Sequence, residues 1–236
     1  MSYFLTSEKL AKGKRFEVIN EEAKHLVESL HAKVGEKFIF QDAAKKRFRV
    51  LVVEVTRHSL TCEVIETLPE GETKKTKINI LQALIAEKAL DFLIQKGTEL
   101  GAAKIVIFPS KNSYIKKIEN VEHKLARWQK ISLEATKQSE RVEPLKVEIA
   151  KDLEEALTYL DDTHTVILSD KKGGKLDPKK LGNEISCLIG PEGGFNKEEM
   201  ERIEKLTTLK LKLSCNILRA ETAGLATISV LEYLTD

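Results

Sequence analysis

Strands and helices alternate over residues 78–236, and this alternation constrains the fold more than any other feature of the sequence. Short apolar runs typical of buried strands occur as INIL, KIVIF, TVILS, ISCLIG and LKLKL, and stretches with helical spacing separate most of them. A regular βα alternation of this length predicts an α/β unit. Its sheet is expected to be mostly parallel and covered by helices on both faces.

The expected helices of this part follow from apolar positions three and four residues apart. The first, over residues 82–100, carries an apolar stripe through Ile85, Ala89, Phe92 and Leu93, and Gly101 stands just past its end. A second helix is expected over about 118–138, with Trp128 on its apolar face. A third covers 152–160, and a last one covers 219–234.

The first 75 residues have a different period. KFIFQD, RFRVLVVEVTRH and LTCEVIETL alternate with period two and are separated by polar turns, which indicates a small β-barrel or sandwich. One helix, beginning at residue 20 and closing at Gly35, interrupts these strands. The polar stretch PEGETKKTK at 69–77 suits an exposed connection, so we expect domains at 1–72 and 73–236.

Composition excludes several classes of protein. The chain has 39 Lys and Arg against 37 Asp and Glu, a net charge of +2, so any nucleic-acid surface must be local. The 3 cysteines lack metal-ligand or paired spacing and the 5 histidines are scattered, so we predict no metal and no disulfide framework. With no membrane-length apolar run and no signal peptide, the expected location is the cytoplasm.

The stretch LIGPEGGFNKEEM at 188–200 is a buried strand that enters a glycine-rich turn before a helix. Glycines at 190, 193 and 194 leave the backbone uncovered, so a ligand could contact the main chain beyond the carboxyl end of the strand. Asn196 and Glu199 have the spacing of a capping box for the next helix. Neither GxGxxG nor GxxxxGK[ST] is present, and local physics alone leaves an ordinary tight turn as an equal alternative.

Four motifs in a fixed order carry a resemblance to a known family. LIGPEGGFNKEE, LSCNILRAETAGLATISVL, QALIAEKALDFLIQKGTELG and KLARWQKISLEATKQSERVEP together resemble the ribosomal RNA small subunit methyltransferase E family. The resemblance covers nearly all of residues 78–236 and is weaker before residue 70. It implies an enzyme that methylates uridine N3 in 16S ribosomal RNA of the small subunit, using S-adenosylmethionine.

The resemblance also implies a SPOUT-class domain with a C-terminal trefoil knot, a preceding PUA-like RNA-binding barrel, and a homodimer. It places the cofactor in the GPEGG loop and the segment that leads into the last helix. The implied cofactor-binding residues are Leu188, Gly190, Pro191, Glu192, Gly193, Gly194, Leu213, Ser214, Asn216, Leu218, Thr222 and Ala223.

Uracil N3 carries a proton, so methylation needs a cation to stabilise the developing anion and a group that accepts the proton. The candidate cation is Arg141, followed by Arg219. The base is Glu99, Glu221 or water, and we assign Arg141, Arg219 and Glu221 as the catalytic set. For Arg141 a surface ion pair is the alternative, and for Glu221 a favourable interaction with the helix N-terminus.

The substrate is expected to contact residues near the ends of two helices. For one pair among them, Lys96 and Glu99, three apart on one helix, a local salt bridge is the commoner outcome. Extra basic charge occurs between Lys104 and Lys151, with 11 Lys and Arg against 6 Glu, and in KKGGKLDPKK at 171–180. The substrate-binding candidates are Lys96, Glu99, Gln138, Ser139 and Arg141.

The chain departs from the family at several positions. Ser214, Cys215 and Asn216 replace a common Gly-Pro-Arg, Glu140 replaces a glycine, and His31 replaces an arginine. Where members of the family often have the sequence ERS, this chain has SKNSY at 110–114. These changes leave two alternatives open: an RNA-binding relative that has lost catalysis, and a SPOUT methyltransferase with another RNA target.

Overall fold

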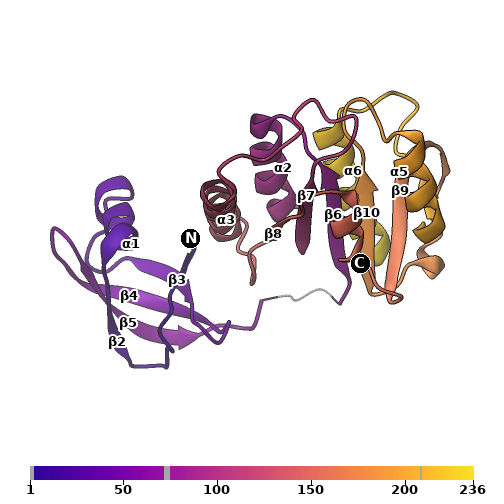
Figure 1. Ribbon diagram of the computed structural model, residues 1–236. Coiled ribbons are helices and arrows are strands. Elements are labelled where there is room, and N and C mark those ends of the chain that lie inside the picture. The colour runs from indigo at the N-terminus through magenta and orange to yellow at the C-terminus, as the bar shows by residue number, and fades with distance from the viewer. Residues whose placement is uncertain (1–2, 72–74, 208) are drawn as a thin grey trace. The chain divides into compact units, whose positions relative to one another are not determined.

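The computed structural model describes residues 3–71, 75–207 and 209–236 of the chain (Figure 1). Its internal contacts form two compact units. The first is Met1–Thr73 with Glu140–Val142, and the second is Lys74–Ser139 with Glu143–Asp236. The boundary expected after residue 72 falls within 72–74, which lie outside the described residues.

The first unit is a five-stranded sheet in the order β1-β3-β4-β5-β2. β1 pairs with β3 in parallel, and the other neighbours are antiparallel. The expected strands are confirmed as β3, β4 and β5, whereas β1 and β2 were not anticipated. The elements are β1 (Tyr3–Leu5), β2 (Arg15–Val18), α1 (Asn20–Lys24), a π-helical turn η1 (His25–Ser29), β3 (Lys37–Gln41), β4 (Arg47–Val55) and β5 (Leu60–Thr67).

Apolar side chains on one face of this sheet form the core of the first unit. The ring of Phe4 stacks on Phe40 at a centroid distance of 5.3 Å, and Phe16 meets Phe40 edge-on at 5.3 Å. Leu26 of η1 is fully buried against them. The single expected helix therefore exists as α1 and η1 but stops at Ser29, before Gly35, and His31 just beyond it has a left-handed φ of 51°.

Glu140–Val142 belongs to the first unit through backbone contacts. Gln41 Nε2 donates to the carbonyl of Val142 at 2.8 Å, and Tyr3 Oη lies 3.3 Å from the carbonyl oxygen of Arg141. Burial of the Tyr3 ring raises the pKa of its hydroxyl above the ordinary value, despite the nearby guanidinium of Arg47. The periodicity of the sequence gave no signal for this grouping and assigned the segment to the second domain.

The second unit contains a six-stranded sheet in the order β11-β9-β10-β6-β7-β8, and every neighbouring pair is parallel. Figure 1 shows β8 and β9 toward opposite sides of it. The all-parallel sheet confirms the expectation from the βα alternation. Its strands are β6 (Lys77–Ala83), β7 (Lys104–Phe108), β8 (Lys146–Ile149), β9 (His164–Gly174), β10 (Glu184–Ile189) and β11 (Leu209–Leu211).

Helices cover both faces of the sheet, as expected. One apolar core joins it to α2, α3 and α6, and a second joins its other face to α4 and α5. Trp128 of α3 is 1% exposed, which confirms its place in the core. The elements are α2 (Glu87–Glu99), α3 (Val121–Gln138), α4 (Leu153–Leu157), a 3-10 turn η2 (Pro178–Lys180), α5 (Lys197–Leu206) and α6 (Ala220–Thr235).

The predicted start of the first of these helices is wrong. β6 continues to Ala83, Ile85 lies in the connection, and α2 begins only at Glu87. Ile85 is buried because the connection also packs into the core, so its apolar character was read as helical spacing. Ala86 offers no side-chain cap that would have marked the boundary.

Close contact between α2 and α6 depends on small residues. A Cβ at Gly224 would lie 2.9 Å from Leu93 Cδ1, and one at Gly97 would lie 3.4 Å from Ile228 Cδ1. The two helices therefore pack with little space between them. In the described ranges, no helix is long and apolar enough to cross a membrane. The same residues contain no group of three or more His, Cys, Asp or Glu placed to hold a metal ion.

Candidate active site

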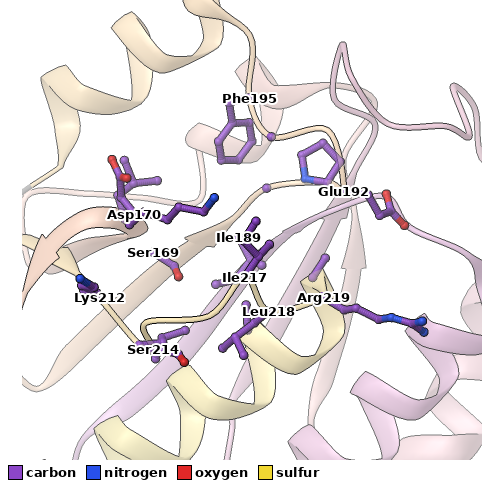
Figure 2. Close-up of a pocket in the computed structure, with 18 of the residues that line it drawn as sticks. Ser169, Asp170, Ile189, Glu192, Phe195, Lys212, Ser214, Ile217, Leu218 and Arg219 are labelled. Carbon is purple, nitrogen blue, oxygen red and sulfur yellow. The ribbon is translucent and has the colours of Figure 1, made fainter.

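A pocket of about 630 Å³ opens in the second unit where β9, β10 and β11 end (Figure 2). Ligands of parallel sheets usually bind at this carboxyl edge, because loops from neighbouring strands meet there. Three chain segments line the pocket: residues 168–171, residues 189–195 with Met200, and residues 212–223. The individual residues are Leu168, Ser169, Asp170, Lys171, Ile189, Gly190, Pro191, Glu192, Gly193, Gly194, Phe195, Met200, Lys212, Leu213, Ser214, Asn216, Ile217, Leu218, Arg219, Ala220 and Ala223.

The GPEGG loop forms a tight turn at the pocket wall. Gly194 donates its N–H to the carbonyl of Pro191 at 2.9 Å and has a φ of 68°, a left-handed conformation that favours glycine. Asn196 then begins α5 with both bonds of the predicted capping box, at 2.8 Å and 3.0 Å. The tight turn therefore forms part of the pocket wall, and the capping-box prediction is confirmed.

The second segment is an irregularity in β9. Its register with β11 changes from Lys210↔Leu168 to Leu211↔Gly174, so residues 169–173 leave the ladder, and Ser169, Asp170 and Lys171 line the pocket. Gly173 makes this possible, because a Cβ there would lie 2.6 Å from the carbonyl carbon of Leu211. Sequence patterns did not place these residues in the pocket, although the strand TVILS followed by Asp170 was a usable signal for a strand end.

The third segment connects β11 to α6. Lys212 donates its N–H to the Gly174 carbonyl at 3.0 Å, and the N–H of Asn216 donates to Ser214 Oγ at 3.1 Å. Arg219 precedes the first residue of α6. In Figure 2 Lys212 and Asp170 lie at one end of the pocket and Glu192 and Arg219 at the other, with apolar side chains between them. The pocket thus has two polar ends and an apolar middle.

Ten of the twelve predicted cofactor-binding residues line this pocket. The exceptions are Leu188 and Thr222. Leu188 is fully buried in the core on the α4 and α5 side of the sheet, and Thr222 is exposed in the first turn of α6. Leu188 and Thr222 are adjacent in sequence to residues that line the pocket. Their own side chains point elsewhere, because successive side chains of a strand or helix point in different directions.

The predicted catalytic residues lie in different places. Arg219 lines the pocket, and Glu221 is half-buried in the next turn without being part of the lining. Arg141 belongs to the segment that groups with the first unit. In all, the pocket lining contains two carboxylates and three cations: Asp170, Glu192, Lys171, Lys212 and Arg219.

Four of the five predicted substrate-binding residues lie near the amino ends of the strands, at the end of the sheet opposite the pocket. α2 and α3 end where the chain turns into β7 and β8, so Lys96, Glu99, Gln138 and Ser139 stand near strand starts. The length of α6 gives the distance between these residues and the pocket. The helix begins at the pocket, and its Glu232, beside Gly101, lies about 18 Å further along the helix axis. Lys96 and Glu99 form the expected salt bridge at 2.8 Å.

Comparison with known proteins agrees with this geometry. The RNA methyltransferase domain family matches residues 72–232. Ribosomal RNA small subunit methyltransferase E of Bacillus subtilis is 27% identical, over 98% of this chain and 95% of that protein. The protein of that name from Mesomycoplasma hyopneumoniae is 32% identical, over 74% of this chain and 77% of its own.

A solved structure is similar over the whole chain. Ribosomal RNA small subunit methyltransferase E from Neisseria gonorrhoeae, bound to S-adenosyl methionine, is 27% identical with a TM-score of 0.88. The similarity covers 99% of this chain and 98% of that one. Taken with the matched domain and the pocket at the carboxyl edge of a parallel sheet, these similarities show that the chain belongs to the RNA methyltransferase domain family and, within it, to ribosomal RNA small subunit methyltransferase E.

Proposed function

We propose that the second unit transfers a methyl group from S-adenosylmethionine to N3 of a uridine in 16S ribosomal RNA. Membership of the family gives the coarser activity, methylation of ribosomal RNA of the small subunit with this cofactor. The observation that carries the proposal is the pocket at the ends of β9, β10 and β11, which contains ten of the residues implied for the cofactor.

The pocket suits a molecule with a flat heterocycle and an amino-acid group. Its volume of about 630 Å³ is within the usual 300–1,000 Å³ of small-molecule sites. Leu213, Ile217 and Leu218 offer apolar contacts for a flat ring, and the turn of Gly193 and Gly194 leaves backbone groups uncovered. Each end carries a cation and a carboxylate, Lys212 with Asp170 and Arg219 with Glu192, so either end offers partners for the two opposite charges of an amino-acid group.

When bound, S-adenosylmethionine supplies an electrophilic methyl group. The protein must hold the uracil N3 in line behind it and exclude water, which alone contributes several kcal/mol to catalysis, about 7–11 in well-oriented systems. Arg219 is the predicted cation that lines the pocket, so we assign it to the developing negative charge on the uracil oxygens. Arg141 remains a prediction from the resemblance.

The proton of uracil N3 needs an acceptor. Between the two predicted carboxylates, Glu99 is paired with Lys96 at the far edge of the sheet, whereas Glu221 lies in the first turn of α6 beside the pocket. We therefore favour Glu221, or a water molecule that it orients. Lys96, Glu99, Gln138 and Ser139 stay predicted contacts of the RNA.

Two finer features of the architecture belong to the proposal. We propose that the first unit, near residues 1–72, is the PUA-like RNA-binding domain and that residues 73–236 form a SPOUT domain with a trefoil knot. The knot is supported by the path of the chain: after β11 at the sheet edge it returns beside the β10 loop, and α6 packs on β6, β10 and α2. A crystal structure in which α6 does not pass through a loop would overturn it.

We also propose a homodimer formed through α2 and α6. α6 has a high mean hydropathy, and exposed apolar side chains remain on both helices, which pack against each other. Those side chains are Phe92 at 48%, Val230 at 36% and Tyr233 at 85% exposed. Covering them would remove apolar area from water. Light scattering should give twice the chain mass for the parent and a lower mass for Tyr233→Glu.

The cofactor site is tested by calorimetry with S-adenosylmethionine. The parent should bind. Ala223→Phe should weaken binding at least tenfold, because a ring at this lining position of α6 fills the pocket. Ala126→Phe, the same change on the exposed face of α3, is the matched control and should bind like the parent. Absence of binding by the folded parent would refute the cofactor site and favour an RNA-binding relative without catalysis.

The target atom is tested separately by mass spectrometry of small-subunit ribosomal RNA after incubation with protein and cofactor. The proposal expects 3-methyluridine, and a methyl group on a ribose or another base would move the chain to a different RNA target. Arg219→Ala should lower the rate without abolishing cofactor binding, which separates catalysis from assembly of the pocket.

A further inference from the structure

The start of the loop of residues 109–119, after β7, is bound by a buried carboxylate. Glu199 of α5 is 6% exposed. Its Oε1 accepts the N–H of Lys111 at 2.8 Å, and its Oε2 accepts from Ser110 Oγ at 3.1 Å and from the N–H of Asn196 at 3.0 Å. The Ser113 N–H also donates to the Ser110 carbonyl at 3.1 Å. Residues 110–113, directly before Tyr114, are therefore fixed by several hydrogen bonds.

Tyr114 projects from this loop into solvent. Its side chain is 83% exposed, while Ser113 before it is 1% exposed. The described residues provide no ring partner or cation for Tyr114. An aromatic ring presented on such a loop is a surface on which a nucleobase can stack, and stacking of this kind tolerates any base.

Several lysines lie on the same loop as the exposed ring or beside the start of that loop. Lys111, Lys116 and Lys117 share the loop with it, and Lys111, Lys116 and Lys151 line a neighbouring cavity of about 510 Å³. Among the described residues, no carboxylate lies within ion-pair distance of these lysines. Of the acidic groups in the same cavity, Glu154 pairs with Arg202, Asp152 caps α4, Glu199 accepts three bonds, and Glu198 is the remaining carboxylate.

The loop adjoins the candidate active site. Asn112 Nδ2 lies 3.5 Å from the carbonyl oxygen of Gly193, a residue of the pocket wall. Asn112 also limits the space at Gly193, since a Cβ there would lie 3.3 Å from Asn112 Cβ. A base stacked on the neighbouring ring would belong to a nucleotide close to the one that enters the pocket.

We propose that the loop of residues 109–119 is a single-stranded RNA subsite, in which Tyr114 stacks on a base that flanks the methylated nucleotide. Lys111, Lys117 and Lys151 contact the phosphates on either side of that base. This inference rests on the proposed function, because it takes RNA as the substrate. It adds a positioning element in a stretch, SKNSY, where this chain departs from its family.

The test measures binding of a fluorescein-labelled RNA copy of a small-subunit rRNA segment that the parent methylates, by anisotropy. Tyr114→Ala should weaken binding by roughly 5- to 150-fold, the range for loss of one base–aromatic stack. Tyr114→Phe and Tyr114→Trp, which keep a ring, should stay within about threefold of the parent. Leu206→Ala, which truncates a side chain 46% exposed at the far end of α5, is the control.

Salt dependence separates the phosphate contacts from the stack. Lys117→Ala should lower the slope of log K against log salt by about 0.7, the value for one phosphate contact on a single strand. Tyr114→Ala should leave that slope unchanged. In turnover assays the tyrosine variant should raise KM more than it lowers kcat, because the stack is made in both the ground and transition states.

Several results would overturn the inference. Equal RNA affinity of the parent and Tyr114→Ala would remove the subsite while leaving the methyltransferase activity intact. Tyr114→Phe as weak as Tyr114→Ala would show that the hydroxyl, not the ring, is needed. A reduced molecular mass of Tyr114→Ala would mean that a second copy of the chain covers the ring. If the parent binds S-adenosylmethionine but methylates no RNA, the proposed function itself fails. That result differs from failure of the subsite alone, in which the parent still methylates RNA.

Discussion

Replacement of Glu199 by Gln should destabilise the second unit because the carboxylate accepts three hydrogen bonds inside the protein. If the new NH2 group takes the place of Oε1, the N–H of Lys111 loses its acceptor. If it takes the place of Oε2, the Ser110 hydroxyl can rotate and accept, but the N–H of Asn196 loses its acceptor. Either arrangement leaves one buried N–H unpaired, which costs about 1–3 kcal/mol.

The assay is urea unfolding followed by fluorescence of Trp128, the single tryptophan, which is buried in the second unit. Glu199→Gln should lower the free energy of unfolding by about 1–3 kcal/mol, or Tm by about 2–4 °C for each kcal/mol. Glu198→Gln removes the neighbouring exposed carboxylate and should change it by less than about 0.5 kcal/mol. Equal stability of the two variants would refute the assigned role of Glu199.

Three further predictions concern other parts of the chain. Arg219→Ala should lower kcat by about 10²–10³ with little change in cofactor affinity, measured by single-turnover methylation, and an unchanged kcat would exclude its role. Gly194→Ala should lower the free energy of unfolding by about 1–2 kcal/mol in urea titration, because its φ of 68° is left-handed although nothing obstructs a Cβ. Burial raises the pKa of the Cys62 thiol to about 11, so the neutral form is favoured in the folded state. The stability of the first unit relative to Cys62→Ala should be intact below pH 9 and fall as the pH rises toward 11, and a flat difference would contradict the assignment.

The sequence predicted the second unit well because its strands are continuous apolar runs. KIVIF and ISCLIG coincide with β7 and β10, which lie inside the sheet and are covered on both faces. β8 was missed because this edge strand has only four residues with mixed polarity, Lys146–Ile149. β1 and β2 were missed for the same reason, since three or four residues are too few to establish a period.

The pocket could be predicted only where its residues are consecutive in sequence. The GPEGG loop and the segment before α6 carry their own glycine and capping signals, so they were found. Lys171 and Ser169 reach the pocket through a change of register between two strands, which depends on pairing rather than on local sequence. For the same reason, no periodicity indicated that Glu140–Val142 packs with the first unit.

The two ends of the six-stranded sheet have a consequence for how this protein associates. The outermost strands, β11 and β8, are only three and four residues long and carry the exposed lysines Lys210 and Lys146. Short, charged outer strands give an incoming strand few backbone groups to pair with, and desolvating the lysines opposes it. Continuation of the sheet from one molecule to the next is therefore disfavoured. We therefore expect self-association of this unit to use helix surfaces rather than the edges of the sheet, which are protected from open-ended aggregation.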